Sequence, residues 1–220
     1  MSCLALIARD IRLASRGGGS TPLALSFFAA VVTLIPLGIG PTPNLLRAVA
    51  GGVIMLCAVL AALLALDDLF QVDFDDGSLD ILATGPLSLE GLATTKIAAH
   101  WVTTGLPLLA ISPLAGFAME IPGRSLAVLM EAVALGTPAV SAVGAIAASL
   151  TLTAKRGGLI LPLIVLPLIA PVVIFGAGIV RGSMEGIANG AALYLSAYSL
   201  AAVLLSPFAV ATGLRINLSA

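Results

Sequence analysis

Only 10% of the 220 residues are charged, whereas 60% are hydrophobic and the mean hydropathy is +1.16. Soluble domains carry about 25% charged residues, so this chain has too little charge to cover a water-exposed surface, and its composition predicts an integral membrane protein. The net charge of −1 provides no basic surface for nucleic acid, and we expect no nucleic-acid partner.

The first segment, residues 4–16, predicts an amphipathic interfacial helix. One stripe, at three- and four-residue spacing, is apolar and consists of Leu4, Ile7, Ile11 and Ala14. The opposite stripe is basic and consists of Arg9, Arg12 and Arg16. Such a helix lies in the headgroup layer with its arginines toward anionic lipid. It is either an orientation signal alone or an elbow helix that contacts a partner, and Gly17–Gly19 predicts a hinge after it.

Six charge-poor stretches reach the roughly 20 residues that a helix needs to cross a bilayer. We predict transmembrane helices at about 21–40, 46–66, 97–119, 125–153, 157–180 and 191–213. The fold class is therefore all-α, and residues 1–220 form a single transmembrane domain. We expect the first span to be retained rather than cleaved as a signal peptide, because its apolar run is longer than a usual signal core.

An even number of spans leaves both termini on one side of the membrane. That side collects seven basic residues, namely Arg9, Arg12, Arg16, Lys96, Lys155, Arg156 and Arg215. The other side collects three, namely Arg47, Arg124 and Arg181. Because cytoplasmic loops carry an excess of Lys and Arg, we predict that both termini are cytoplasmic and that residues 67–96 form a cytoplasmic loop.

This loop holds most of the negative charge of the chain. Six of the eleven acidic residues lie between Asp67 and Leu82, namely Asp67, Asp68, Asp73, Asp75, Asp76 and Asp80. An EF-hand loop aligned on Gly77 would have the wrong residue at three of its four acidic positions, which argues against calcium. A bare solvated loop remains an alternative.

Apolar residues alternate with these aspartates, which favours a short cytoplasmic helix over a bare loop. On one helix, Phe70, Asp73, Gly77 and Asp80 would share a side. Gly85-Pro86 is typical of a helix end, and the next helix would begin near Ser88. A short helix with mixed faces between two breaks suits docking to another protein.

Several chemistries are missing from the sequence. Neither Lys96 nor Lys155 lies in a G-K-[ST] motif, so we expect a non-enzymatic chain without a Walker A phosphate loop. His100 is the single histidine, which excludes paired-histidine metal sites, and we expect no metal. Glu131 is either a carboxylate near the outer interface or the lining of an outward cavity. A secondary transporter would need inverted repeats and mid-membrane charge, neither of which is clear.

The acidic segment carries a family resemblance. The pattern Phe70-x-x-Asp73-x-x-Asp76-Gly77-Ser78-Leu79-Asp80-x-Leu82 resembles the signature of the CcmB family, and Lys96–Leu114 resembles the stretch that follows it there. That family is the membrane subunit of the haem-handling ABC complex of cytochrome c maturation. One departure is Asp80, where the family pattern has glutamate, a change that keeps the charge and shortens the side chain by one methylene.

The resemblance implies an ABC-2-type exporter membrane domain in the bacterial inner membrane, whose partner is a separate cytoplasmic ABC ATPase that binds ATP. It also implies a haem-presenting membrane subunit, a small accessory membrane protein, a periplasmic haem chaperone and two copies of this chain per complex. Residues 67–96 would then be the coupling loop. The partner-contacting set would be Phe70, Asp73, Asp76, Gly77, Ser78, Leu79, Asp80 and Leu82.

The expected function is to couple ATP hydrolysis by that partner to haem export, or to release of the haem-loaded chaperone. A scaffold that relays ATPase motion without transport is the alternative. Haem would be bound through the complex. His100 and Trp101 are either an interface pair that anchors the third span, with Trp101 in an aromatic belt, or His100 is an axial haem ligand or a packing switch. Pro162, Pro167 and Pro171 predict either tolerated kinks or a re-entrant segment.

Overall fold

The computed structural model describes residues 3–14, 20–152, 157–187 and 189–218, and the predicted hinge at Gly17–Gly19 lies outside them. Most of the described residues are helical, and six helical segments are long and apolar enough to cross a membrane, which confirms the all-α class with six spans. The elements are α1 (Cys3–Ala14), α2 (Ser20–Ile39), α3 (Pro43–Leu66), α4 (Asp68–Asp75), α5 (Ser78–Ala83), α6 (Leu89–His100), the π-helix η1 (Trp101–Gly105), α7 (Leu106–Ala118), α8 (Gly123–Thr151), α9 (Gly157–Glu185) and α10 (Ala191–Leu218).

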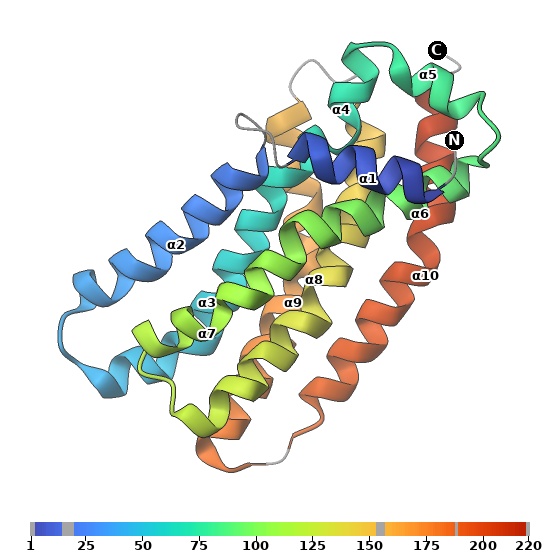
Figure 1. Cartoon of the computed structure of the whole chain (residues 1–220). Coiled ribbons are helices and arrows are strands. Elements are labelled where there is room, and N and C mark those ends of the chain that lie inside the picture. The colour runs from blue at the N-terminus through green and yellow to red at the C-terminus, as the bar shows by residue number, and fades with distance from the viewer. Residues whose placement is uncertain (1–2, 15–19, 153–156, 188, 219–220) are drawn as a thin grey trace.

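The long helices run side by side, whereas α1 lies across one end of the bundle (Figure 1). The short helices α4 and α5 lie at that same end, where both chain termini are found (Figure 1). Among the described residues, the molecule therefore has one end with extra helices and an opposite end made of the turns between spans.

Sequence signals explain where the helices of the third span begin. The Ser88 side chain accepts a hydrogen bond from the Gly91 backbone N–H at 3.1 Å, which satisfies a free donor of the first turn of α6. The helical path then continues through α6, η1 and α7 from Leu89 to Ala118. It starts eight residues before the predicted span at 97–119, so the last part of the predicted loop at 67–96 is a helical extension of the span.

The proline-rich span is one helix. Pro167 and Pro171 lie within α9, which runs without a break over the residues that the structure describes. The re-entrant alternative for this segment is therefore wrong, and the prolines are accommodated inside a spanning helix. The Tyr198 hydroxyl of α10 donates to the Leu168 carbonyl in this stretch and ties the two helices together.

Helices α3 and α8 contribute more of the buried core than any other described helices, and small residues let their neighbours approach closely. A Cβ added at Gly51 of α3 would lie 3.1 Å from Val180 Cβ and 3.2 Å from the Ala177 carbonyl oxygen in α9. Small residues are typical of helix contacts inside membranes, where close backbone approach replaces the hydrophobic driving force. Gly51 thus sets the distance between α3 and α9.

We predict that Gly51→Val destabilises the protein by about 1–3 kcal/mol, because the added side chain would push α3 away from the backbone of α9. The measurement is thermal or denaturant unfolding of the purified chain in detergent. Gly52→Val is the matched control, since a Cβ at Gly52 meets nothing within 4 Å. Equal losses for the two variants would show that the α3–α9 contact does not limit stability.

Candidate functional site: the acidic segment and its ionic cluster

The acidic segment is two short helices rather than one. Helix α4 ends at Asp75, and Gly77 takes a left-handed conformation with φ of 72°, which a glycine adopts without steric cost. Asp76 Oδ1 accepts a hydrogen bond from the Ser78 backbone N–H at 2.8 Å, and hydrogen bonds from Ser78 hold the Asp76 pKa below its usual value. The prediction that Gly77 and Asp80 continue the face of Phe70 is therefore wrong.

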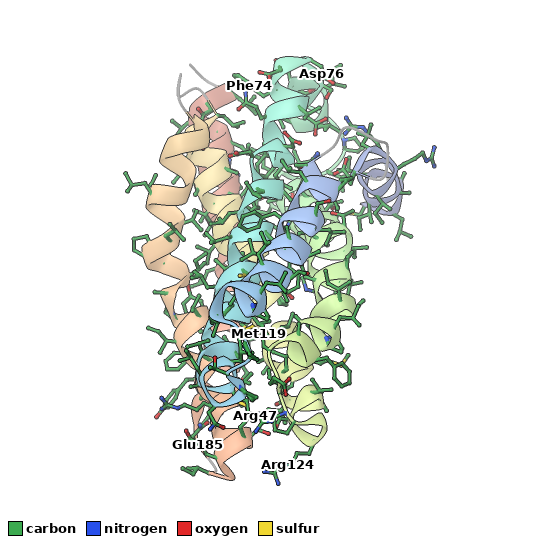
Figure 2. The ribbon with its side chains drawn as sticks, turned by 90° about the vertical axis from the view of Figure 1, so that its left-hand side faces the viewer. Arg47, Phe74, Asp76, Met119, Arg124 and Glu185 are labelled. Atoms are coloured by element: carbon green, nitrogen blue, oxygen red, sulfur yellow. The ribbon has the colours of Figure 1, made fainter. Side chains whose placement is uncertain are left out.

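The predicted partner-contacting set divides by burial. Phe70, Asp73 and Leu79 are 0%, 2% and 1% exposed, so these three side chains contact the rest of this chain. By contrast, the exposed members are Asp76, Gly77 and Asp80, and the half-buried members are Ser78 and Leu82. Asp76 lies at the end of the bundle opposite to Arg47, Arg124 and Glu185 (Figure 2).

Asp73 is the centre of a buried ionic cluster. Its carboxylate accepts hydrogen bonds from the Arg9 guanidinium of α1 and from the Lys96 ammonium of α6. The Ser78 hydroxyl of α5 also donates to Asp73, over 2.9 Å. Lys96 forms a second ion pair with Asp10 at 3.1 Å, and Arg9 Nη1 lies 3.5 Å from Asp10 Oδ1. Four charges from α1, α4 and α6 therefore meet, and α5 joins them through Ser78.

Burial makes these charges dependent on each other. The Lys96 side chain is 6% exposed and that of Asp73 is 3% exposed, so neither charge is compensated by water. The hydrogen bond to Asp73 raises the pKa of Arg9, whereas burial raises the pKa of Asp10. Breaking one partner of a buried pair costs more than the pair contributes to stability. The cluster thus fixes how the helices meet at this end.

Sequence reasoning missed this cluster. The arginine stripe of α1 was expected to face lipid headgroups, but Arg9 instead turns toward Asp73. Arg9 and Asp73 are 64 residues apart, and Asp73 and Lys96 are 23 apart, so no local spacing relates them. One available signal was the position of Lys96 inside a helical, mostly apolar stretch, where a lone cation needs a partner.

His100 and Trp101 bind across the helix interface to α8. His100 is 4% exposed, and its Nδ1 lies 2.9 Å from the Ser141 hydroxyl oxygen. The Trp101 indole N–H donates to the Thr137 hydroxyl over 3.1 Å. Ser141 and Thr137 are one helical turn apart on α8. These bonds connect the third span to α8, and the two interpretations of the pair, an anchor at the membrane interface or a haem contact, stay predictions.

Glu131 does not belong to this cluster. It lies on α8 two turns after Gly123, near the end of the bundle opposite to α4 and α5, and its side chain is exposed on the outside of the chain. This exposure agrees with both alternatives for Glu131, an interface carboxylate or the lining of an outward cavity, so both stay predictions. Of the predicted sites, the structure thus joins the acidic segment to α1 and α6 and leaves Glu131 apart.

Comparison with known proteins gives a consistent result. The family model described as "CcmB protein" matches residues 1–217. "Heme exporter protein B" of Rhodobacter capsulatus is 48% identical over 215 residues, which cover 97% of this chain and 99% of that protein. The protein of the same name from Escherichia coli strain K12 is 41% identical over 210 residues, which cover 95% of this chain and 96% of that protein. The chain therefore belongs to the CcmB family.

Proposed function

We propose that this chain is the membrane subunit of an ABC-type complex for haem export in cytochrome c maturation. The proposal is supported by the family membership and by the name of the relatives, heme exporter protein B. The observation that carries it is the pair of helices α4 and α5 at one end of the bundle (Figure 1). Buried ion pairs of Asp73 fix α4 to α1 and α6, and the Ser78 hydroxyl joins α5 to the same carboxylate.

The surface that would meet the ATPase consists of Asp76, Asp80 and Ile81. The two carboxylates are exposed and acidic, and Ile81 is 73% exposed at the end of the bundle beyond the spans. Ile81 adds an exposed apolar side chain to this acidic surface. The partner is a separate cytoplasmic ABC ATPase with a complementary basic groove, as expected from electrostatic steering.

In the proposed mechanism, ATP binding moves the ATPase and, with it, α4 and α5. Because Asp73 binds Arg9 and Lys96, that motion passes to α1 and to the third span at the same time. A change at the far end requires that the ATPase contacts differ between the two states. Phe70, Asp73 and Leu79 then transmit the motion from inside the chain, while the exposed residues make the contact.

The complex would lie in the bacterial inner membrane, with both termini of this chain cytoplasmic. It would include two copies of this chain, a haem-presenting membrane subunit, a small accessory protein and a periplasmic haem chaperone. Haem is the cargo. The same coupling would serve haem export, release of the haem-loaded chaperone, or the relay of ATPase motion by a scaffold that does not itself transport haem.

The docking surface is tested by the double variant Asp76→Lys/Asp80→Lys. We expect it to reduce co-purification of the ABC ATPase by about tenfold or more, since charge reversal at a complementary interface repels the partner. Both side chains are exposed, so folding should be retained.

The control for this experiment is Glu185→Lys, which reverses an exposed charge at the opposite end of the bundle (Figure 2). Co-purification with Glu185→Lys should match the unmodified chain. Undiminished ATPase binding by Asp76→Lys/Asp80→Lys would place the docking surface elsewhere and remove this part of the proposal.

The ionic cluster is tested by Asp73→Asn. This change leaves Lys96 and Arg9 with a single buried carboxylate, that of Asp10, and should lower the free energy of unfolding by about 3–5 kcal/mol. The double variant Asp73→Asn/Lys96→Met removes both a negative and a positive charge, so it should lose less than the sum of the two single variants.

Unfolding of the purified chain in detergent measures these differences. Asp75→Asn is the matched control, because Asp75 is two positions from Asp73 but exposed, and its change should have little effect. Additive losses in the double variant would show that Asp73 and Lys96 act independently and that the cluster is not the connection proposed here.

A further inference from the structure

Glu131 is a carboxylate on the outside of a spanning helix. Its side chain is exposed on α8, and its carboxylate forms no ion pair or hydrogen bond with another described residue. The other described carboxylates at this end of the bundle, opposite to α4 and α5, are paired, Glu120 with Arg47 and Glu185 with Arg181. Glu131 is therefore the described carboxylate at this end that the chain leaves without a cation.

Glu131 also lies deeper than the charged layer at this end. Arg124 belongs to that layer, together with Arg47 and Glu185 (Figure 2). Glu131 follows Arg124 by seven residues, which is about 10 Å along a helix. Helix α8 has 29 residues and is about 44 Å long, so a centred hydrocarbon core of about 30 Å begins about 7 Å from its first residue. Glu131 lies about 12 Å from that residue, and hence inside the core.

The face of α8 that carries Glu131 is uncovered in one half of the helix. At about 100° per residue, Ala142 and Ala145 lie within about 40° of Glu131 around the helix axis. Both are 0% exposed, whereas Ala127, one turn from Glu131 toward Arg124, is exposed. The chain thus covers this face in the half of α8 nearer to α4 and α5 and leaves it open around Glu131.

An open carboxylate at this depth calls for a partner. Ionisable side chains inside membranes almost always face a bundle interior or a water-filled cavity, and they pair with another group. Glu131 instead points away from its own bundle, so a helix from outside the chain would place it in an interior. Ala127 and Ala134, one turn to either side of Glu131, leave room for such a helix to approach closely.

We propose that the Glu131 face of α8, made of Ala127, Glu131 and Ala134, docks a membrane-spanning helix of another subunit that carries an arginine or lysine at the depth of Glu131. The cation would neutralise the carboxylate and donate charge-assisted hydrogen bonds to it, which are stronger than neutral ones. The inference rests on the proposed function only in that the chain works together with other membrane subunits. It does not depend on ATPase docking at α4 and α5.

A second copy of this chain fits the Glu131 face poorly. Two copies related by a two-fold axis along the membrane normal hold every residue at the same depth. The copy would therefore bring its own Glu131 to this level, and like charges repel. Its Arg124 would stay about 10 Å away along the helix axis. The charge of the face thus selects a different chain.

Site-specific photo-crosslinking tests the partner. The full chain, expressed in bacterial membranes with the other subunits of the complex, carries p-benzoylphenylalanine in place of Met130, an exposed neighbour of Glu131. The control position is Ile174 of α9, which is 64% exposed and lies seven residues from Arg181, at the same distance from the charged layer. The crosslinked segments are identified by mass spectrometry.

We expect an adduct with a membrane-spanning segment of another subunit that has an arginine or lysine within one turn of the crosslinked residue. That adduct should be at least about fivefold more abundant from Met130 than from Ile174. An adduct with a second copy, with a segment that lacks a basic residue, or with no protein at all overturns the proposal. The last result would leave Glu131 facing lipid or water.

Charge variants test the ion pair. Glu131→Gln should lower the crosslink at least about tenfold, because it leaves the partner's cation unpaired inside the membrane. Glu131→Lys combined with glutamate at the partner's basic position should restore at least half of it. Glu185→Gln is the matched control, since Glu185 is exposed at the same end but in the charged layer, and it should change nothing. An unchanged crosslink in Glu131→Gln, or no restoration by the exchange, overturns the ion pair.

ATPase co-purification from the same membranes separates this inference from the proposed function. Glu131→Gln should lower the crosslink and keep ATPase binding within about twofold, because α4 and α5 lie at the opposite end of the bundle. An equal loss of crosslink and ATPase would mean that the change disrupts the whole complex, and it would overturn the local role of Glu131. Failure of ATPase docking at Asp76 and Asp80 would leave the crosslink as it is.

Discussion

The arrangement of the end of the bundle that carries α1, α4 and α5 depends on one carboxylate that accepts from three donors. Asp73 binds the guanidinium of Arg9, the ammonium of Lys96 and the hydroxyl of Ser78 while remaining 2% exposed. Each donor belongs to a different helix. If α4 moved while the other helices stayed in place, a buried charge would lose its partner in an apolar environment, which is costly. The constraint is electrostatic, and it acts on α1, α5 and α6 together.

This constraint changes how the acidic segment should be understood. A run of aspartates on an apolar chain looks like one uniform surface, but its members have separate tasks. Asp73 holds the segment in place, Asp76 starts α5 by accepting from Ser78, and Asp80 remains exposed. Mutations at these three positions should therefore not be pooled as a single class when an effect on the segment is measured.

The sequence predicted the parts of the fold that depend on length and composition. Six charge-poor stretches correspond to six spanning segments, because a bilayer imposes a minimum apolar length on each helix. It did not predict the contacts of Arg9 and Lys96 with Asp73, because these residues are brought together by the packing of whole helices. The break at Gly77 was also missed, because a helical count through Asp76 assumed an uninterrupted element.

The π-helix at Trp101–Gly105 has a consequence for the face that the third span turns inward. At about 100° per residue, an uninterrupted α-helix would place Leu108 about 120° around the axis from Lys96. A π turn accommodates one additional residue, which reduces that offset to about 20°. Lys96, His100 and Leu108 are all buried, in agreement with this alignment. The additional residue thus lets a single span bury Lys96 of the ionic cluster and, further along, the apolar Leu108 on the same face.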